Sequence, residues 1–181
     1  MKSQFFNLKQ LLGQTLEYQT QNRRGAFPYE HYSLLGLLCH LKQPKRILEL
    51  GTAMGLSAIT MALASPETMI DTIDKNEEIR NIAKEKAKEF KVFERINFIH
   101  STFKDALPGL KQEYDLIFFD GFAPDLELFM QFESKLKPGG LMVSANLTLG
   151  RDSESCIQRM KNPEFYQHFF YFDDTGVAVR V

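Results

Sequence analysis

The sequence has few cysteines, no tryptophan, no long apolar run and no excess of charge of either sign. Cys39 and Cys156 are the only cysteines in 181 residues. They lie far apart and lack C-x-x-C spacing, so neither a disulfide framework nor a cysteine zinc site is indicated. The 22 Lys and Arg residues are balanced by 23 Asp and Glu residues, so the overall charge supports binding neither to nucleic acid nor to an anionic membrane.

The opening stretch MKSQFFNLKQLLGQTLEYQ lacks the uninterrupted apolar core of a signal peptide. No later segment contains the roughly 20 consecutive apolar residues that a membrane span requires. We therefore expect an unprocessed protein in the reducing cytoplasm. A chain of 181 residues fits a single domain. We expect an N-terminal helix and connecting segment at residues 1–27, followed by the core at residues 28–181.

Strands and helices alternate along most of the chain. Apolar periodicity and Gly or Pro breaks predict helices at residues 5–16, 32–41, 56–64, 76–90 and 128–136, and strands at residues 46–50, 68–74, 95–99, 114–120 and 141–145. The segments YQHFFYF and GVAVRV, separated by DDT, are typical of a hairpin. The pattern predicts an α/β fold: a Rossmann-like, doubly wound, mostly parallel sheet of seven strands with an antiparallel C-terminal hairpin and helices on both faces.

In such a sheet ligands bind at the carboxyl ends of the strands, near the point where the strand order reverses. Gly51, Asp74, Ser101 and Asp120 each follow a predicted strand, which places them along one edge. Gly51 and Gly55 allow a sharp turn and a close approach to a ligand. The same glycines also suit a plain strand-to-helix connection, and Asp74 also suits the N-cap of the next helix.

Five segments together resemble a known family. ILELGTAMGLSA, TIDKNEE, FIHSTFKDALPGL, YDLIFFDGF and LKPGGLMVSAN occur here in the order and spacing of the class I S-adenosylmethionine-dependent methyltransferases. The chain is more narrowly similar to the small O-methyltransferases related to catechol and caffeoyl-CoA O-methyltransferases. The similarity covers roughly residue 28 to the C-terminus.

The resemblance implies that S-adenosylmethionine is the methyl donor and a small hydroxylated molecule the acceptor. Gly51 to Gly55 would lie against the methionine part of the donor, Ser57 would bind its carboxylate, and Asp74 would bind the ribose hydroxyls. Ser101, Thr102 and Phe103 lie where the family contacts adenine, and Phe122 would cover the adenine face. The full set implied for the donor is Glu49, Gly51, Thr52, Ala53, Gly55, Ser57, Asp74, Lys75, Ser101, Thr102, Phe103, Asp120 and Phe122.

The sequence departs from the family pattern where many relatives bind a divalent cation. Asp120 and Asn146 match two of the ligands, but Ala145 stands where the family has the other Asp. A hard dication prefers several oxygen ligands, so we expect no metal to be required. Ala123 stands where catechol enzymes have a Lys that helps to deprotonate the acceptor.

A catalytic base must then come from elsewhere. His31 precedes the helix that leads to the first strand and has a suitable ordinary pKa, so we take it as a candidate base alongside Asp120, which would orient donor or acceptor. A surface hydrogen-bonding role is the alternative for His31. We expect the other three histidines to be packing residues; they are His40, His100 and His168. Arg23 and Arg24 either attract an acidic acceptor or are simply solvated.

Two further functions fit parts of the pattern. The loss of the two catalytic groups at Ala123 and Ala145 allows a protein that binds the donor without catalysis. A nicotinamide-dependent oxidoreductase would also need a glycine turn and a ribose acid, but the loose glycine spacing and the LKPGG turn disfavour it. Relatives are often dimers, so the resemblance allows a homodimer, with the N-terminal helix serving either the contact or its own core.

Overall fold

The computed structural model describes residues 2–22, 28–122 and 124–181, with side chains described from Leu8 onward. The helices are α1 (Lys2–Asn22), α2 (Tyr32–Lys42), α3 (Leu56–Ala64), α4 (Glu77–Glu89), α5 (Phe103–Ala106), α6 (Leu126–Glu133) and α7 (Ser153–Lys161), with 3₁₀ turns at Phe93–Arg95 and Leu107–Gly109. The strands are β1 (Arg46–Leu50), β2 (Met69–Asp74), β3 (Ile96–His100), β4 (Tyr114–Phe119), β5 (Leu136–Ser144), β6 (Tyr166–Phe172) and β7 (Thr175–Arg180).

The seven strands form one sheet in the order β3-β2-β1-β4-β5-β7-β6. All neighbouring pairs are parallel except the two that involve β7. The chain winds outward from β1 to β3 on one side and from β4 to β5 on the other, so the strand order reverses between β1 and β4. This confirms the predicted doubly wound sheet with an antiparallel C-terminal hairpin.

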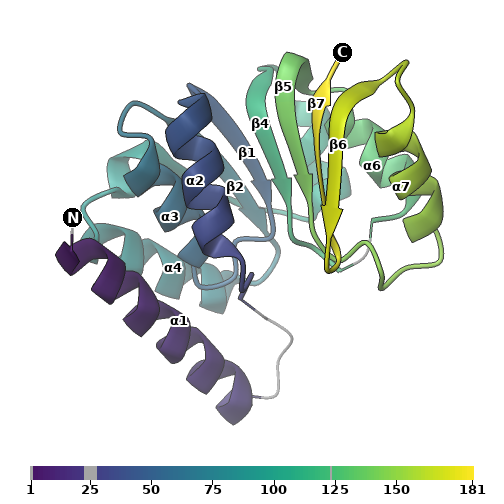
Figure 1. Ribbon diagram of the computed structural model, residues 1–181. Helices are drawn as coiled ribbons and strands as arrows, with labels where there is room; N and C mark the ends of the chain where they lie inside the picture. Colours follow the sequence, from purple (N-terminus) through teal and green to yellow (C-terminus); the bar gives the residue numbers. More distant parts are fainter. Residues whose placement is uncertain (1, 23–27, 123) are drawn as a thin grey trace.

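The sheet lies between two helical layers. Figure 1 shows α2, α3 and α4 on one side and α6 and α7 on the other. Alternate side chains of β4 enter the two cores, because successive strand residues point to opposite faces. Leu116 and Phe118 join the core under α2 and α3, whereas Ile117 and Phe119 join the core under α6 and α7. Burial on both faces explains the near-continuous apolar sequence of this strand.

Three expectations about the elements were wrong. The helix expected to run to Leu136 ends at Glu133, and β5 begins at Leu136 and includes the PGG segment, with Gly139 at a φ of +72°. Helix α7 was not expected, because its only fully buried side chains are Ser153, Cys156 and Met160. The other three histidines, expected to pack inside, are exposed: His40, His100 and His168.

Helix α1 packs on the same molecule. Leu8 and Leu11 are buried in the core that α2 and α3 share, which favours an internal role for this helix over an intermolecular contact. Tyr18 also donates a hydrogen bond to Glu78 of α4 over 3.0 Å. In the described part of the chain, no helix combines the length and apolarity of a membrane span. Cys39 and Cys156 are both buried as free thiols.

Candidate functional site

The carboxyl ends of the parallel strands bring the predicted residues to one edge of the sheet. Backbone hydrogen bonds join this edge: Gly51 N donates to Ile73 O (3.0 Å), Asp120 N to Leu50 O (2.8 Å) and Ser101 N to Asp74 O (3.3 Å). Ala145 N donates to Phe119 O over 2.8 Å, so the end of β5 belongs to the same edge. Residues 51, 74, 101, 120 and 145 therefore follow five adjacent strands, as the sequence predicted.

The glycine turn after β1 is tight for two different reasons. Gly51 has a φ of +110°, and a Cβ there would come within 2.5 Å of the Asp120 carbonyl oxygen. Gly55 has a φ of +84°, and its Cβ would meet the Cβ of Ala83 in α4 at 3.1 Å. We expected Gly55 to leave room for the methionine part of a donor, but the direction of its missing Cβ shows that it permits packing of the turn against α4. Ala53, between them, also has a positive φ of 42°.

Asp74, at the end of β2, ties the turn to the next helix. Its Oδ2 accepts from Ala53 N over 3.1 Å, and its Oδ1 accepts from Asn76 N over 2.8 Å. The N-cap of α4 is Asn76, not Asp74. Because a carboxylate has about four acceptor positions, Asp74 retains capacity for the two hydroxyls of a ribose. A hollow of about 660 Å³ opens beside it, lined by the start of α4.

Glu49 lies under the turn in a hydrogen-bonded network that is closed to solvent. Ser57 Oγ donates to its Oε1 over 2.5 Å, Thr72 donates to its Oε2, and Thr52 Oγ1 lies 2.6 Å from Thr72 Oγ1. Burial raises the pKa of Glu49 to about 7, against the two hydroxyl donors that lower it, and the charge of Asp74 raises it further. Ser57 was expected to donate to an external carboxylate, but its proton is used by Glu49.

Asp120 and Asn146 meet after β4 and β5. Asn146 Nδ2 donates to Asp120 Oδ1 over 3.2 Å and to the Gly121 carbonyl over 2.8 Å. Burial raises the pKa of Asp120 well above its usual range, and the charges of Glu49 and Asp174 raise it further, against the hydrogen bond from Asn146. Ala145 is buried among apolar side chains. In the described residues, no group of three or more His, Cys, Asp or Glu side chains is arranged to hold a metal ion.

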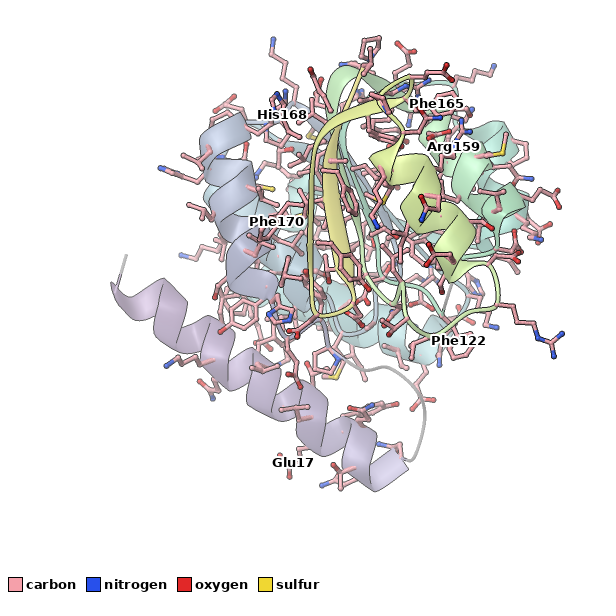
Figure 2. The ribbon with its side chains drawn as sticks, turned by 45° about the vertical axis from the view of Figure 1, so that its right-hand side comes forward. Glu17, Phe122, Arg159, Phe165, His168 and Phe170 are labelled. Atoms are coloured by element: carbon pink, nitrogen blue, oxygen red, sulfur yellow. The ribbon has the colours of Figure 1, made fainter. Side chains whose placement is uncertain are left out.

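The end of the edge expected to hold adenine is built by α5 and the loop after β4. Thr102 caps α5 by accepting from Asp105 N over 3.2 Å, while the ring of Phe103 packs on Phe119 at 5.9 Å. Phe122 is 84% exposed and lies near the lower edge of the sheet in Figure 2. Lys75 is exposed, and its carbonyl lies 3.1 Å from His100 Nε2. Phe122 is therefore accessible to stack on a ligand, whereas Phe103 supports the loop from beneath.

Sequence reasoning missed a polar group that the β6–β7 turn and the segment before α2 bring to this edge. Leu147 N donates to Asp174 O over 2.9 Å, which holds the turn beside the end of β5. Tyr29 OH lies 3.3 Å from Thr175 Oγ1. Burial raises the pKa of Tyr29 to about 12, partly offset by Thr175, and the charges of Asp120 and Asp174 raise it further. No sequence motif signals this contact, because residues 29 and 175 are 146 positions apart.

His31 lies in the same group, as the residue before α2. Its Nε2 is 2.9 Å from Asp173 Oδ2 in the β6–β7 turn. Arg23, Arg24 and Ala123, which the sequence also singled out, lie outside the described residues. The edge therefore combines acidic groups from β1, β2, the end of β4 and the last hairpin with His31 and His100.

Comparison with known proteins identifies similar chains. A family model described as O-methyltransferase matches residues 2–161. Tapetum-specific methyltransferase 1 of Arabidopsis thaliana is 32% identical over 148 residues, which cover 77% of this chain and 62% of that protein. The catechol O-methyltransferase of Niastella koreensis is 32% identical over 119 residues, covering 62% of this chain and 54% of that protein. The chain thus spans about three fifths of the length of these relatives.

Solved structures share the fold. The O-methyltransferase TomG from Streptomyces achromogenes, in complex with SAM, superposes with a TM-score of 0.80 at 22% identity, over 94% of this chain and 89% of that one. An O-methyltransferase from Bacillus cereus in complex with SAH gives a TM-score of 0.76 at 18% identity, over 94% and 90% of the two chains. At these identities the superpositions establish the shared fold.

Proposed function

Since this chain belongs to the O-methyltransferase family, we propose that it transfers a methyl group from S-adenosylmethionine to a hydroxyl of a small acceptor, without a divalent metal. The observation that carries the proposal is the charge of the strand-end edge. Glu49, Asp74 and Asp120 have no ion-pair partner among the described residues. A cationic ligand is the missing complement.

The donor fits this edge group by group. Its ammonium and sulfonium carry positive charge, which the half-buried carboxyl of Asp120 would balance at the edge, with Glu49 adding its charge from beneath the turn. Its carboxylate needs N–H donors, and the first turn of α3 has no side-chain cap. Its ribose diol needs an acceptor, which Asp74 supplies. When bound, the donor supplies an electrophilic methyl group on a positively charged sulfur.

The reaction proposed here relies on positioning more than on a metal. In metal-dependent relatives the cation gathers two acceptor oxygens and lowers the pKa of one. Here Ala145 removes a ligand, and the amide nitrogen of Asn146 faces Asp120 Oδ1 and the Gly121 carbonyl. Because the Gly121 carbonyl can only accept, the amide nitrogen must face it, so on this side Asn146 presents a donor and not an oxygen ligand. Alignment of acceptor and donor can itself supply much of the acceleration.

Two alternatives predict different measurements. A protein that only binds the donor would have the same affinity but no turnover, and a nicotinamide enzyme would bind NAD. A homodimer remains part of the proposal on the basis of the family, and its test is the mass in solution.

The test begins with calorimetry against S-adenosylmethionine, S-adenosylhomocysteine and NAD. We expect binding of the first two and none of the third. The protein is then incubated with methyl-labelled donor and a panel of catechols, phenols, hydroxylated metabolites and nucleosides, with and without EDTA. Transfer of label to a hydroxyl in EDTA supports the proposal, and binding without transfer to any acceptor supports the non-catalytic alternative.

A further inference from the structure

The β6–β7 turn places a carboxylate against the histidine that precedes α2. Asp173 Oδ2 lies 2.9 Å from His31 Nε2, and the two side chains are 71% and 37% exposed. An ion pair so accessible to water contributes little to stability, typically less than about 1 kcal/mol. Stability therefore does not account for the pairing, and the exposure leaves the imidazole within reach of a small molecule.

Two aromatic rings hold the imidazole in place. The ring of Tyr29 meets it edge-on at 5.6 Å, and the ring of Phe172 does so at 5.0 Å. The contact with Asp173 uses Nε2, so Nδ1 is left without a hydrogen-bond partner among the described residues. A neutral histidine that donates from one nitrogen presents the other as a proton acceptor.

Tyr29 connects this pair to the rest of the edge. Its hydroxyl approaches Thr175, and the charge of Asp120 acts on it. The Tyr29 ring lies between His31 and β4, because it contacts the imidazole at 5.6 Å and the ring of Phe118, near the end of β4, at 4.9 Å. The charged groups near this ring are the carboxylates of Asp120, Asp173 and Asp174. All three of these groups are acidic.

We propose that His31 is the general base of the methyl transfer and that Asp173 is its positioning residue; this inference rests on the proposed function. The acceptor O–H bond breaks, its proton goes to Nδ1 of His31, and the oxygen forms a bond to the methyl carbon. The carbon–sulfur bond breaks and its electron pair returns to sulfur, which becomes neutral. The positive charge thus passes from sulfur to the imidazolium, which Asp173 faces. The help with deprotonation that catechol enzymes obtain from a Lys, at the position of Ala123 here, is supplied from a different part of the chain.

The experiment compares His31→Ala, Asp173→Asn and the control Glu30→Gln, which removes a neighbouring exposed charge. Asparagine is chosen because Asp173 has a φ of 49°, a conformation that Asn tolerates. With labelled donor and catechol, we expect kcat to fall about 100-fold for His31→Ala and about tenfold for Asp173→Asn, in line with the 10²–10⁴ contribution of a general base. Donor affinity should stay within about twofold in both variants, and added imidazole should restore part of the His31→Ala rate.

A second readout does not depend on turnover. The imidazole nitrogens of the four histidines are followed by NMR in protein saturated with S-adenosylhomocysteine. Adding catechol should move the His31 signal in the wild type and move it less in Asp173→Asn, while the other three histidines serve as internal references.

The outcomes separate the two proposals. Transfer by the wild type with both variants equal to Glu30→Gln, or a His31 signal that catechol leaves unmoved, overturns the role of His31 and leaves the proposed function standing. Donor binding without transfer to any hydroxyl in the panel overturns the proposed function and the base with it.

Discussion

At the scale of single residues, the informative feature is a pair of carboxyls, of which Glu49 is fully buried and Asp120 half-buried. Glu49 and Asp120 come from adjacent strands, and each has its pKa raised chiefly by burial. Hydroxyl and amide groups, all neutral, are their hydrogen-bond partners. Burying an ionised carboxyl without a cation is costly. In the free protein, ionising these carboxyls therefore lowers the stability, and a cationic ligand bound beside them would offset that loss.

This cost predicts a pH dependence of stability that Glu49 controls. Its pKa rises from 4.5 in the unfolded chain to about 7 in the folded protein. Between these values the folded state keeps a proton that the unfolded state has lost, so the free energy of unfolding falls as the pH rises from about 4.5 to 7. Above that range the full penalty is present, on the order of 3 kcal/mol.

The measurement is urea unfolding of wild type and Glu49→Gln at pH 5 and pH 8. Glutamine stays neutral at both pH values. From pH 5 to pH 8 the free energy of unfolding of the variant should therefore rise relative to that of the wild type by roughly 1 to 3 kcal/mol. Titrating groups that do not interact with Glu49 cancel in this difference, and Asp120 and Asp74, whose charges act on Glu49 or are acted on by it, contribute with it. If the free energies of unfolding of the two proteins changed equally with pH, burial would not raise the pKa of Glu49.

Asp74 is the residue that we expect to set donor affinity. In Asp74→Asn the ribose diol loses a charged acceptor, and hydrogen bonds to charged groups are worth about 1.5 to 3 kcal/mol. Calorimetry with S-adenosylhomocysteine should show a dissociation constant at least about tenfold higher. Glu85→Gln, at an exposed position farther along α4, is the matched control. Equal affinity of Asp74→Asn and the control would place the ribose elsewhere.

At the scale of elements, the glycine turn couples β1 to α4. Gly55→Ala adds a Cβ at a φ of +84° and 3.1 Å from the Cβ of Ala83, whereas Gly139→Ala adds one at a φ of +72° with nothing within 4 Å. Both substitutions cost about 1–2 kcal/mol through the left-handed conformation. In thermal unfolding, we expect Gly55→Ala to lower the stability more than Gly139→Ala does. Only Gly55→Ala should weaken donor binding, because its Cβ would push α4 away from the turn. Equal destabilisation would mean that the contact with Ala83 is unimportant.

Elements with strong periodicity were predictable from the sequence, and those held by tertiary contacts were not. The buried run of β4 and the amphipathic α4 were identified from the order of their residues. Helix α7 carries too few apolar side chains to stand out. The start of β5 was hidden because Pro138 and Gly139 resemble a break, yet Leu136 pairs with Tyr114 before an irregularity in register.

At the scale of the whole molecule, the same contrast divides the site. Gly51, Asp74 and Asp120 were predictable because each ends or directly follows a strand, and the carboxyl ends of parallel strands share one edge. The group around Tyr29, Asp173 and Thr175 was not, because it depends on β7 pairing antiparallel with β5, which brings the last turn back to that edge. The part of the site that is formed by turns directly after strands can be predicted from the order of the residues. The part that depends on long-range pairing of the C-terminal hairpin cannot.

The balance of charge over the whole edge leads to a last prediction, on metal. We expect that EDTA changes donor affinity and methyl transfer by less than about twofold, since Asp120 and Asn146 offer only one formal charge. Mg²⁺ should leave the melting temperature of the wild type unchanged. Ala145→Asp places a carboxyl next to Asn146 at a position buried among apolar side chains, so the metal-free variant should melt at a lower temperature than the wild type. Mg²⁺ at ten times its dissociation constant should raise the melting temperature of this variant by about 3–6 °C.

The matched control for the introduced metal site is Ala145→Asp combined with Asp120→Asn, which keeps the new carboxyl but removes its partner, so it should lose the rise. Wild-type activity that disappears in EDTA and returns with Mg²⁺ would contradict metal independence. A further metal ligand would then be needed beside Asp120. Asp174 is the better candidate, because its charge already acts on Asp120. Asp125 is the poorer candidate, because it caps α6 and pairs with Lys104. In that case Asp174→Asn should abolish the response to Mg²⁺, and the last hairpin would hold the cation in place of β5.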